Sequence, residues 1–574
     1  MRYLRMLSNS VIAAALASAY VLTLVLALNP SVPLTPQGVI PLISTVGLYY
    51  TLNLTVLAYI VLVFWQLLSL ELFSPAWISV GVLVWLGAFA AAVGSALMWR
   101  NVTTFALVLD DSAEAALARI GIALTLAAAA FVLVAVIRRT LPEGRPGWAT
   151  LLVIVMGASV AFPLALRGRG VAPVLEARPI DAEVDGAVPE RTTRVTIIAL
   201  DAASLDFITS ATAEGRLPNF GRLLDRGAVR HLATLHPTSA ETVWAAVATG
   251  KLPQKNGIHS AGLYRITNAS GVPLQLLPEY CFAHGLVRLG VLTEEPHSSA
   301  TFRTRTLWSI LSTHGITVGV VGWPLSQPAP TVRGFLVADS FHRWALTAAA
   351  VDGPATIYPA ELQPDAIAAM ETAGADADSS AADESPAHID RVYERVAQKL
   401  SERRAVQVAV TRYQSLDPIG HHYLRYATPS EFGDVTDDER QRLGGVLERH
   451  YEMIDEAVGR TLAALGPDDL LVVVSAFGMV PLTLGKRIVE KLLGDPDLSG
   501  THDAAPDGFL IAYGTSVARG RSQTRASVVD VTPTLLYFLG LPVGRDMDGY
   551  VRTDLFSPSF IQDRPIAYIP TYDR

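Results

Sequence analysis

The 574-residue chain is 51% hydrophobic and 17% charged, with a mean hydropathy of +0.35. This composition is too apolar for an ordinary soluble protein and indicates membrane spans attached to a globular part. The formal net charge of -8, without a basic cluster, argues against nucleic acid as a partner, and the single cysteine excludes an intramolecular disulfide framework.

The first 169 residues, predicted to be a transmembrane region (1–169), contain five long apolar runs, each able to supply the ~20 residues that cross ~30 Å of hydrocarbon. The runs occupy residues 10–28, 39–68, 77–99, 113–137 and 148–166. We expect four or five spans, because the first run follows Arg2 and Arg5 and also fits a signal sequence. Lysine and arginine placement weakly favours a cytoplasmic N-terminus. Five spans then predict a multi-pass cell-membrane protein with an extracytoplasmic C-terminal domain, whereas an even number reverses this.

Residues 170–193 mix glycine, proline and charge without periodicity and are predicted to be a linker. In the domain that follows, 194–574, strand-like runs such as "VTIIALD", "AVQVAVTRY" and "DLLVVVS" alternate with helix-like runs such as "LPNFGRLLDRG" and the long segment 431–466. This alternation predicts an α/β fold with a mostly parallel central sheet, flanking helices, and function at the carboxyl ends of the strands. The low-complexity stretch 371–387 is predicted to be a disordered surface loop.

Four residues are candidates for a metal site. Asp201 ends the strand "VTIIALD", where a carboxylate either reaches a ligand crevice or caps a helix. Asp417 and His421 are four residues apart in "LDPIGHHY", so both converge on one cation if the segment is helical, with a turn aspartate and a surface histidine as the alternative. His502, in a loop rich in turn residues, completes a possible set of two histidines and one carboxylate, the ligand type of hydrolytic zinc sites.

From residue 195 to the C-terminus, seven segments occur in an order similar to that of a known family. They are "VTIIALDAASLDFI", "GRLPNFGRLLDRGAV", "PTSAETVWAAVATGKLPQKNGI", "TLWSILSTHGITVGVVGWP", "DPIGHH", "SGTHDAAPDGFLIAYG" and "VVDVTPTLLYFLGLPVGRDMDG". The chain resembles the type I phosphodiesterase/nucleotide pyrophosphatase family of the alkaline phosphatase superfamily. This resemblance implies an alkaline phosphatase-like domain, and it does not extend to the apolar N-terminal region.

Members of that family use two metal ions, usually zinc, and a threonine or serine nucleophile that is phosphorylated and then released by water. The resemblance implies that Asp417, His421 and His502 hold one metal and that Asp201 is a ligand of the second. An adjacent Asp-His pair should complete the second site, but Ala476 and Phe477 stand at those positions. Ala240 stands at the nucleophile position, and only its neighbour Ser239 offers a substitute hydroxyl there.

Three functions follow from these departures. In the first, the domain is a degenerate family member, a pseudoenzyme that keeps at most one zinc or other divalent ion and acts as a binding or sensing module. In the second, it is a one-metal hydrolase or transferase in which water bound to a cation on Asp417, His421 and His502 attacks a phosphate ester. Glu241 would act there as a base, or is simply a solvated helix residue.

The third function keeps the covalent mechanism through Ser239, with unusual metal ligation. In all three functions the membrane is an expected partner. A phosphate-ester, lipid-linked or glycan ligand is expected as well, because five spans exceed what a simple anchor requires.

Overall fold

The computed structural model describes residues 2–68, 80–140, 147–169, 193–267, 269, 271–279, 285–344, 355–375, 386–502, 505–521 and 524–573. The chain forms two compact units: the first comprises Met1–Glu176 and Gly262–Pro296, and the second Ala177–Ala261 and His297–Arg574. The predicted linker lies outside the described residues except for Thr193. A single domain over 194–574 stays a prediction; within that range, Gly262–Pro296 packs with the apolar helices.

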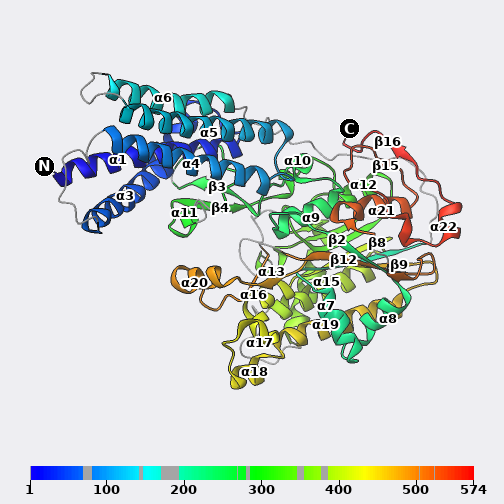
Figure 1. Ribbon diagram of the computed structural model, residues 1–574. Coiled ribbons are helices and arrows are strands. Elements are labelled where there is room, and N and C mark those ends of the chain that lie inside the picture. Colours follow the sequence, from blue (N-terminus) through cyan, green and yellow to red (C-terminus); the bar gives the residue numbers. More distant parts are fainter. Residues whose placement is uncertain are drawn as a thin grey trace. The chain divides into compact units, whose positions relative to one another are not determined.

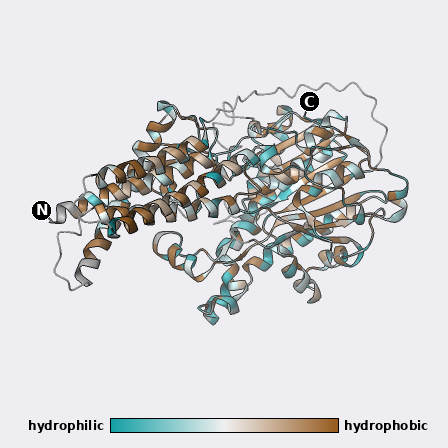
Figure 2. Ribbon diagram, turned by 45° about the horizontal axis from the view of Figure 1, so that its top comes forward, coloured by the Kyte–Doolittle hydropathy of each residue, from teal (hydrophilic) through white to brown (hydrophobic). Residues whose placement is uncertain are grey.

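The first unit consists mainly of apolar helices. Figure 2 shows these helices as brown, or hydrophobic, over most of their surfaces. Five of them are long and apolar enough to span a membrane, which agrees with the upper end of the expected range. The helices are α1 (Arg2–Leu28), α2 (Pro36–Leu42) continuing through a short π-helix (Ile43–Gly47) into α3 (Leu48–Leu68), α4 (Val80–Thr104), α5 (Asp111–Thr140) and α6 (Trp148–Arg167).

A buried asparagine connects α1 to the segment 262–296, which contains the antiparallel strands β3 (Gly262–Ile266) and β4 (Leu292–Pro296) and the short helix α11 (Gly285–Arg288). The Asn29 amide nitrogen donates to the carbonyl oxygens of Val25 (2.7 Å) and Leu276 (2.8 Å). Its amide oxygen accepts from the backbone nitrogens of Gln275 (2.6 Å) and Leu276 (3.0 Å). All four hydrogen-bonding positions of this buried amide are therefore satisfied.

The ends of two further helices meet the same part of the first unit. The Arg167 guanidinium, at the end of α6, donates to the carbonyl oxygens of Leu26 (2.9 Å) and Asn29 (2.8 Å). The Asn101 amide oxygen, near the end of α4, accepts from the backbone nitrogen of Glu279 (3.0 Å). The C-terminal ends of α1, α4 and α6 are thus held together by polar contacts beside residues 275–279.

The second unit is built on a ten-stranded sheet in the order β13-β2-β12-β9-β1-β8-β5-β6-β7, with β14 paired to β2 (Figure 1). The five strands from β9 to β6 are parallel to one another, whereas β12 and β7 are antiparallel to their neighbours. This confirms the predicted mostly parallel sheet. The strands are β1 (Val195–Leu200), β2 (Ala228–Ala233), β5 (Val318–Trp323), β6 (Gly334–Ala338), β7 (Ile357–Tyr358), β8 (Val408–Tyr413), β9 (Leu470–Phe477), β12 (Asp507–Tyr513), β13 (Gly520–Arg521) and β14 (Ala526–Ser527).

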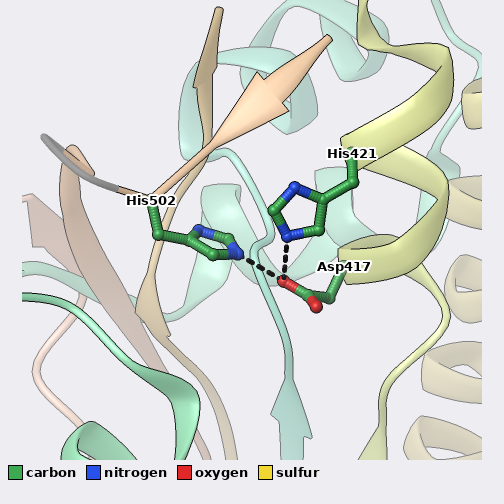
Figure 3. Close-up of side chains that lie close together, drawn as sticks. All are labelled: Asp417, His421 and His502. Atoms are coloured by element: carbon green, nitrogen blue, oxygen red, sulfur yellow. Dashed lines mark hydrogen bonds and ion pairs between the residues drawn. The ribbon is translucent and has the colours of Figure 1, made fainter. Parts of the chain in front are cut away.

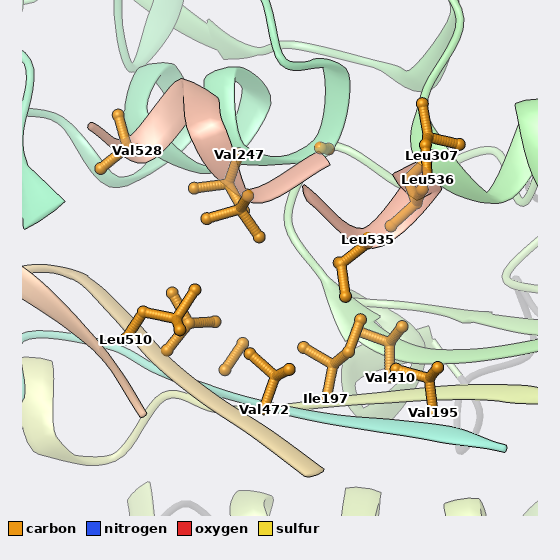
Figure 4. Close-up of a cluster of buried hydrophobic side chains, with 14 of the residues drawn as sticks. Val195, Ile197, Val247, Leu307, Val410, Val472, Leu510, Val528, Leu535 and Leu536 are labelled. Atoms are coloured by element: carbon orange, nitrogen blue, oxygen red, sulfur yellow. The ribbon is translucent and has the colours of Figure 1, made fainter. Parts of the chain in front are cut away.

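Alternate residues of the central strands pack against helices on opposite faces of the sheet. On β1, Val195 and Ile197 belong to the cluster drawn in Figure 4, whereas Ile198 and Leu200 belong to a cluster on the other face. A strand buried on both faces needs apolar residues at every position, which explains the nearly continuous run "VTIIAL". The first face is covered by α9 (Ala240–Thr249), α12 (Leu307–Thr313) and α21 (Val531–Phe538), and the second by α7 (Leu205–Ala213), α8 (Pro218–Arg226), α16 (Leu416–Ala427) and α19 (Val446–Ala464).

Two expectations from the sequence, one for a helix and one for a loop, differ from the structure. The segment 431–466 is not one helix: it divides into the end of α17 (Pro429–Phe432), α18 (Asp437–Leu443) and α19. Gly433 adopts a positive φ of 70° and ends α17, and the capping box of Thr436 and Glu439 starts α18. The loop predicted over 371–387 is wrong at both described ends, because α14 (Gln363–Ala375) and α15 (Pro386–Arg403) extend into it; residues 376–385 lie outside the described residues.

Candidate metal centre

Helix α16 brings Asp417 and His421 to one face, as their spacing predicted for a helical segment. The helix begins directly after β8, at the carboxyl edge of the parallel strands. The buried Asp390 carboxylate fixes this strand-to-helix turn by accepting hydrogen bonds from the backbone nitrogens of Gln414 (2.8 Å) and Ser415 (3.1 Å). Residues four apart on a helix lie about one turn apart, so the carboxylate and the imidazole face the same space.

Both candidate histidines are oriented by backbone carbonyl groups. His421 Nδ1 lies 2.9 Å from the carbonyl oxygen of Gly500, and His502 Nδ1 lies 3.0 Å from that of Gly478. A carbonyl oxygen only accepts, so each Nδ1 carries the proton and each Nε2 is directed elsewhere. Figure 3 shows both Nε2 atoms directed at Asp417, whose Oδ1 lies 2.5 Å from His502 Nε2 and 3.8 Å from His421 Nε2.

These three groups fit a divalent cation. Their ligand atoms all lie within 4.8 Å of one another, and all three side chains are partly buried. Ligating histidines characteristically donate their second ring nitrogen to a carbonyl or carboxylate, as both do here. Burial raises the pKa of Asp417, but the hydrogen bond and charge of His502 outweigh it and hold that pKa below its usual range. The carboxylate is therefore ionised, and the Nε2 proton that His502 donates to it would be released when a metal ion binds there.

Asp201 has different partners. The fully buried carboxylate forms an ion pair with the Arg412 guanidinium, whose Nε lies 3.0 and 3.1 Å from the two carboxylate oxygens. The indole nitrogen of Trp244 donates to the same carboxylate at 2.7 Å. Asp201 is not a helix cap, because Ser204 caps α7. A guanidinium and an indole thus occupy the carboxylate that the resemblance assigns to a second metal.

The sheet register explains why Arg412 meets Asp201. Arg412 of β8 is paired with Ala199 of β1, and it is in phase with Val408 and Val410, which face α9. Asp201 continues the same alternation on β1, two residues after Ala199. The sequence analysis missed Arg412, although a charged residue in phase with the apolar positions of a buried strand was a usable signal. Such a charge is rarely buried without a partner.

Arg412 stays protonated in this environment. Burial lowers the pKa of the guanidinium, but the carboxylates of Asp201, Asp339 and Glu241 outweigh burial and raise that pKa above its usual range. A permanent positive charge is therefore held beside Asp201, the carboxylate that the resemblance assigns to a second metal.

Ala476 and Phe477 are fully buried and contribute only apolar surface beside this ion pair. The Phe477 ring centroid lies 4.9 Å from that of His502 and 6.4 Å from that of Trp244, both in edge-on contacts. Trp244 in turn packs edge-on against Trp323 at 5.1 Å. Phe477 therefore contacts both His502 of the candidate metal centre and Trp244, the hydrogen-bond partner of Asp201.

The start of α9 carries the remaining candidates. Ala240 is the first residue of the helix, and Ser239 is its N-cap. The Ser239 hydroxyl accepts from the backbone nitrogen of Thr242 (3.3 Å) and donates to the Thr242 hydroxyl (2.8 Å), so it serves the cap. Glu241 is half-buried, burial raises its pKa to about 7, and the charge of Arg412 acts to lower that pKa.

These features define an α/β domain of the alkaline phosphatase type, with a candidate three-residue metal site at the carboxyl edge of a mostly parallel sheet. The chain belongs to the type I phosphodiesterase / nucleotide pyrophosphatase family, whose profile matches residues 195–530, more than half of the sequence. That family is normally metal-dependent. Among curated proteins, no match to this chain was found.

Proposed function

We propose that this protein is a membrane-anchored, extracytoplasmic phosphate-ester-binding member of the family, in which one divalent ion is held and covalent phosphoryl transfer has been lost. The observation that carries the proposal is the Asp201–Arg412 ion pair. A second cation would have to displace a guanidinium from a buried carboxylate. Breaking such a pair leaves an uncompensated buried charge, which costs about 3–5 kcal/mol.

The surrounding residues support the same proposal. Ala476 and Phe477 supply no donor atoms for a second ion, and Ala240 has no nucleophilic oxygen. The Ser239 hydroxyl, the nearest substitute, already caps α9. A covalent mechanism of the family's type needs a nucleophile and a second metal that stabilises charge on the phosphoryl oxygens, and the residues at the family's positions supply neither the nucleophile nor a full ligand set for that metal.

A phosphate ester suits the groups that remain. A zinc or similar ion on Asp417, His421 and His502 would act as a Lewis acid toward a phosphate oxygen. Arg412 adds a permanent positive charge within electrostatic reach of Asp417, and guanidinium groups are well suited to phosphate oxygens. The anchoring spans make a lipid-linked phosphate or a lipid-linked glycan the most accessible ligand class.

A second candidate function, one-metal hydrolysis, is favoured by Glu241. Its pKa of about 7, raised by burial, matches that of a general base at neutral pH. The Glu241 carboxylate also lies within electrostatic reach of Asp417 and Arg412, so a water between them would meet a proton acceptor beside a cation. This function differs from the first only in whether a bound ester is cleaved.

Metal analysis of the purified full-length protein, followed by turnover of a chromogenic phosphodiester, separates these functions. We expect one zinc per chain, its loss in His421→Ala, and its retention in His422→Ala. His422 is the matched control because its Nδ1 faces Asp495 at 3.9 Å and not the centre. No turnover at full metal content supports the binding module.

Three other outcomes contradict that first proposal. Turnover that disappears in both His421→Ala and Glu241→Gln supports the one-metal hydrolase. Turnover lost only in Ser239→Ala supports the covalent mechanism. Two bound metals per chain in the wild-type protein would contradict the displacement of the second ion by Arg412.

A further inference from the structure

Helix α20 (Leu484–Leu493) exposes its apolar side. Leu484 is 70% exposed, Ile488 52%, Val489 47% and Leu492 75%. At 100° per residue these four side chains occupy one continuous face of the helix. Isolated exposed apolar residues are normal on protein surfaces, whereas four on one face of a ten-residue helix mark a surface that contacts something apolar.

The polar side of α20 faces the domain. Lys486 Nζ donates to the Thr501 hydroxyl at 3.1 Å. The Arg487 guanidinium forms an ion pair with Asp434 at 2.9 Å and lies over the Phe432 ring.

Glu490, also on the polar side, accepts from the backbone nitrogen of Asp495 at 3.2 Å. Lys486, Arg487 and Glu490 are therefore less exposed than the leucines. This orientation is the reverse of that of a helix that packs its apolar face on a core and its polar face in water.

We propose that α20 lies in the membrane interface, with Leu484, Ile488 and Leu492 among the lipid acyl chains. The chain itself carries five helices able to span a bilayer, so the second unit is covalently tethered to a segment that a lipid surface would hold. Tethering raises the effective concentration of that surface, so a helix of only ten residues, about 15 Å long, is sufficient. The exposed Lys491 at the edge of the apolar face complements anionic headgroups, in contrast to the net charge of -8 of the whole chain.

This position would bring the metal centre to the membrane surface. Helix α20 lies between β10 (Val480–Pro481) and β11 (Gly500–Thr501), which pair with each other. The ends of this segment are Gly478 and Gly500, whose carbonyl oxygens orient His502 and His421. The docking element and the two imidazoles thus belong to one hydrogen-bonded assembly. The inference concerns where the domain rests, and it holds whether or not a bound ester is cleaved.

Depth-resolved fluorescence on the full-length protein tests the proposal. In a Cys281→Ser background, an environment-sensitive dye is attached to Leu492→Cys and, as the matched control, to Tyr550→Cys, a residue 77% exposed. The protein is reconstituted in nanodiscs of phosphatidylcholine and phosphatidylglycerol. Quenching by a spin-labelled acyl chain and by aqueous iodide is then compared. Circular dichroism melting checks that each labelled variant is folded.

We expect the dye at position 492 to be quenched several-fold more strongly by the lipid-borne quencher than the dye at position 550, with the reverse order for iodide. Equal access of both dyes to iodide would overturn the proposal. Protection at position 492 from both quenchers would also overturn it, because the face would then be covered by protein, such as a second copy of the chain.

Discussion

The family resemblance implies a metal site of two halves, and the structure places different partners around the candidate ligands of each half. In one half, Asp417 and His421 on α16 and His502 after β11 direct their ligand atoms to a common point. In the other half, Asp201 lies at the same edge of the sheet, but its carboxylate is already bound by Arg412 and Trp244. The strands and turns that deliver both halves are intact.

If Asp201 marks a second metal position, as the resemblance implies, the difference teaches that a guanidinium from within the chain can take the place of a cation without disturbing the fold. Removing an Asp-His pair leaves a buried carboxylate without compensation, which is strongly unfavourable. A guanidinium supplied from the neighbouring strand restores neutrality, and the Phe477 ring fills the remaining space. The first half needs no such replacement, because its ligands retain the partners that orient them.

The largest effect is expected from removing the internal cation. Arg412→Ala leaves Asp201 buried and unpaired, and we expect a loss of about 3–5 kcal/mol in stability. Thermal unfolding followed by tryptophan fluorescence measures it, since Trp244 contacts the same carboxylate. The double variant Arg412→Ala/Asp201→Asn should recover much of the loss, because no unpaired charge remains. Equal melting of Arg412→Ala and wild type would show that the pair does not replace a cation.

Restoring metal ligands in the second half tests the difference between the two halves directly. Ala476→Asp with Phe477→His restores two ligands, but we expect metal content to stay at one per chain while Arg412 holds Asp201. Adding Arg412→Ala should then raise it to two, as measured by elemental analysis of the dialysed protein. A second metal already bound by the variant that keeps Arg412 would refute the displacement.

A smaller effect is expected from pH. Glu241 is neutral below its pKa of about 7 and charged above it. At saturating zinc, binding of a phosphodiester anion should weaken about threefold to tenfold as the pH rises from about 6 to about 8, since one negative charge is added at a partly screened distance. Calorimetric titration measures this, and Glu241→Gln should bind independently of pH in that window. A profile unchanged in Glu241→Gln would assign the titration to another group.

The stability that Glu241 contributes to the folded protein should also fall as the pH rises, in the same direction as ligand binding. Its folded pKa of about 7 lies above the ordinary 4.5, so the folded protein holds a proton that the unfolded chain loses between these values. Stability from this group is therefore present at acid pH and is lost as the pH rises through about 7.

The smallest effect is expected at the start of α9. Ser239→Ala removes the helix cap and should cost about 1 kcal/mol of stability. Ligand binding and any turnover should be unchanged, because the hydroxyl serves Thr242 and not the centre. Unfolding and turnover are measured on the same preparation. Abolished turnover with little change in melting would instead assign Ser239 a chemical role.

Local sequence patterns predicted much of this structure. The alternation of strands and helices predicted the mostly parallel sheet, and the spacing of Asp417 and His421 predicted a shared helix face. His502 joins them from 81 residues beyond His421, a distance in sequence that no periodicity spans, so only the family resemblance linked the three. Gly478 and Gly500 orient the histidines through backbone carbonyl groups, so no side chain in the sequence indicates their role. Arg412 required the register between β1 and β8, which two separate strand patterns do not contain.

The amide of Asn29 has a consequence for biosynthesis. Its partners at positions 275 and 276 are synthesised almost 250 residues after it, when the residues of β1, β2 and α9 of the second unit have already been synthesised. The first unit therefore completes its polar contacts only after synthesis of the second has begun, because the two units are interleaved in the sequence. No single cut in the chain separates them, so a shortened protein would leave one unit without part of its own structure.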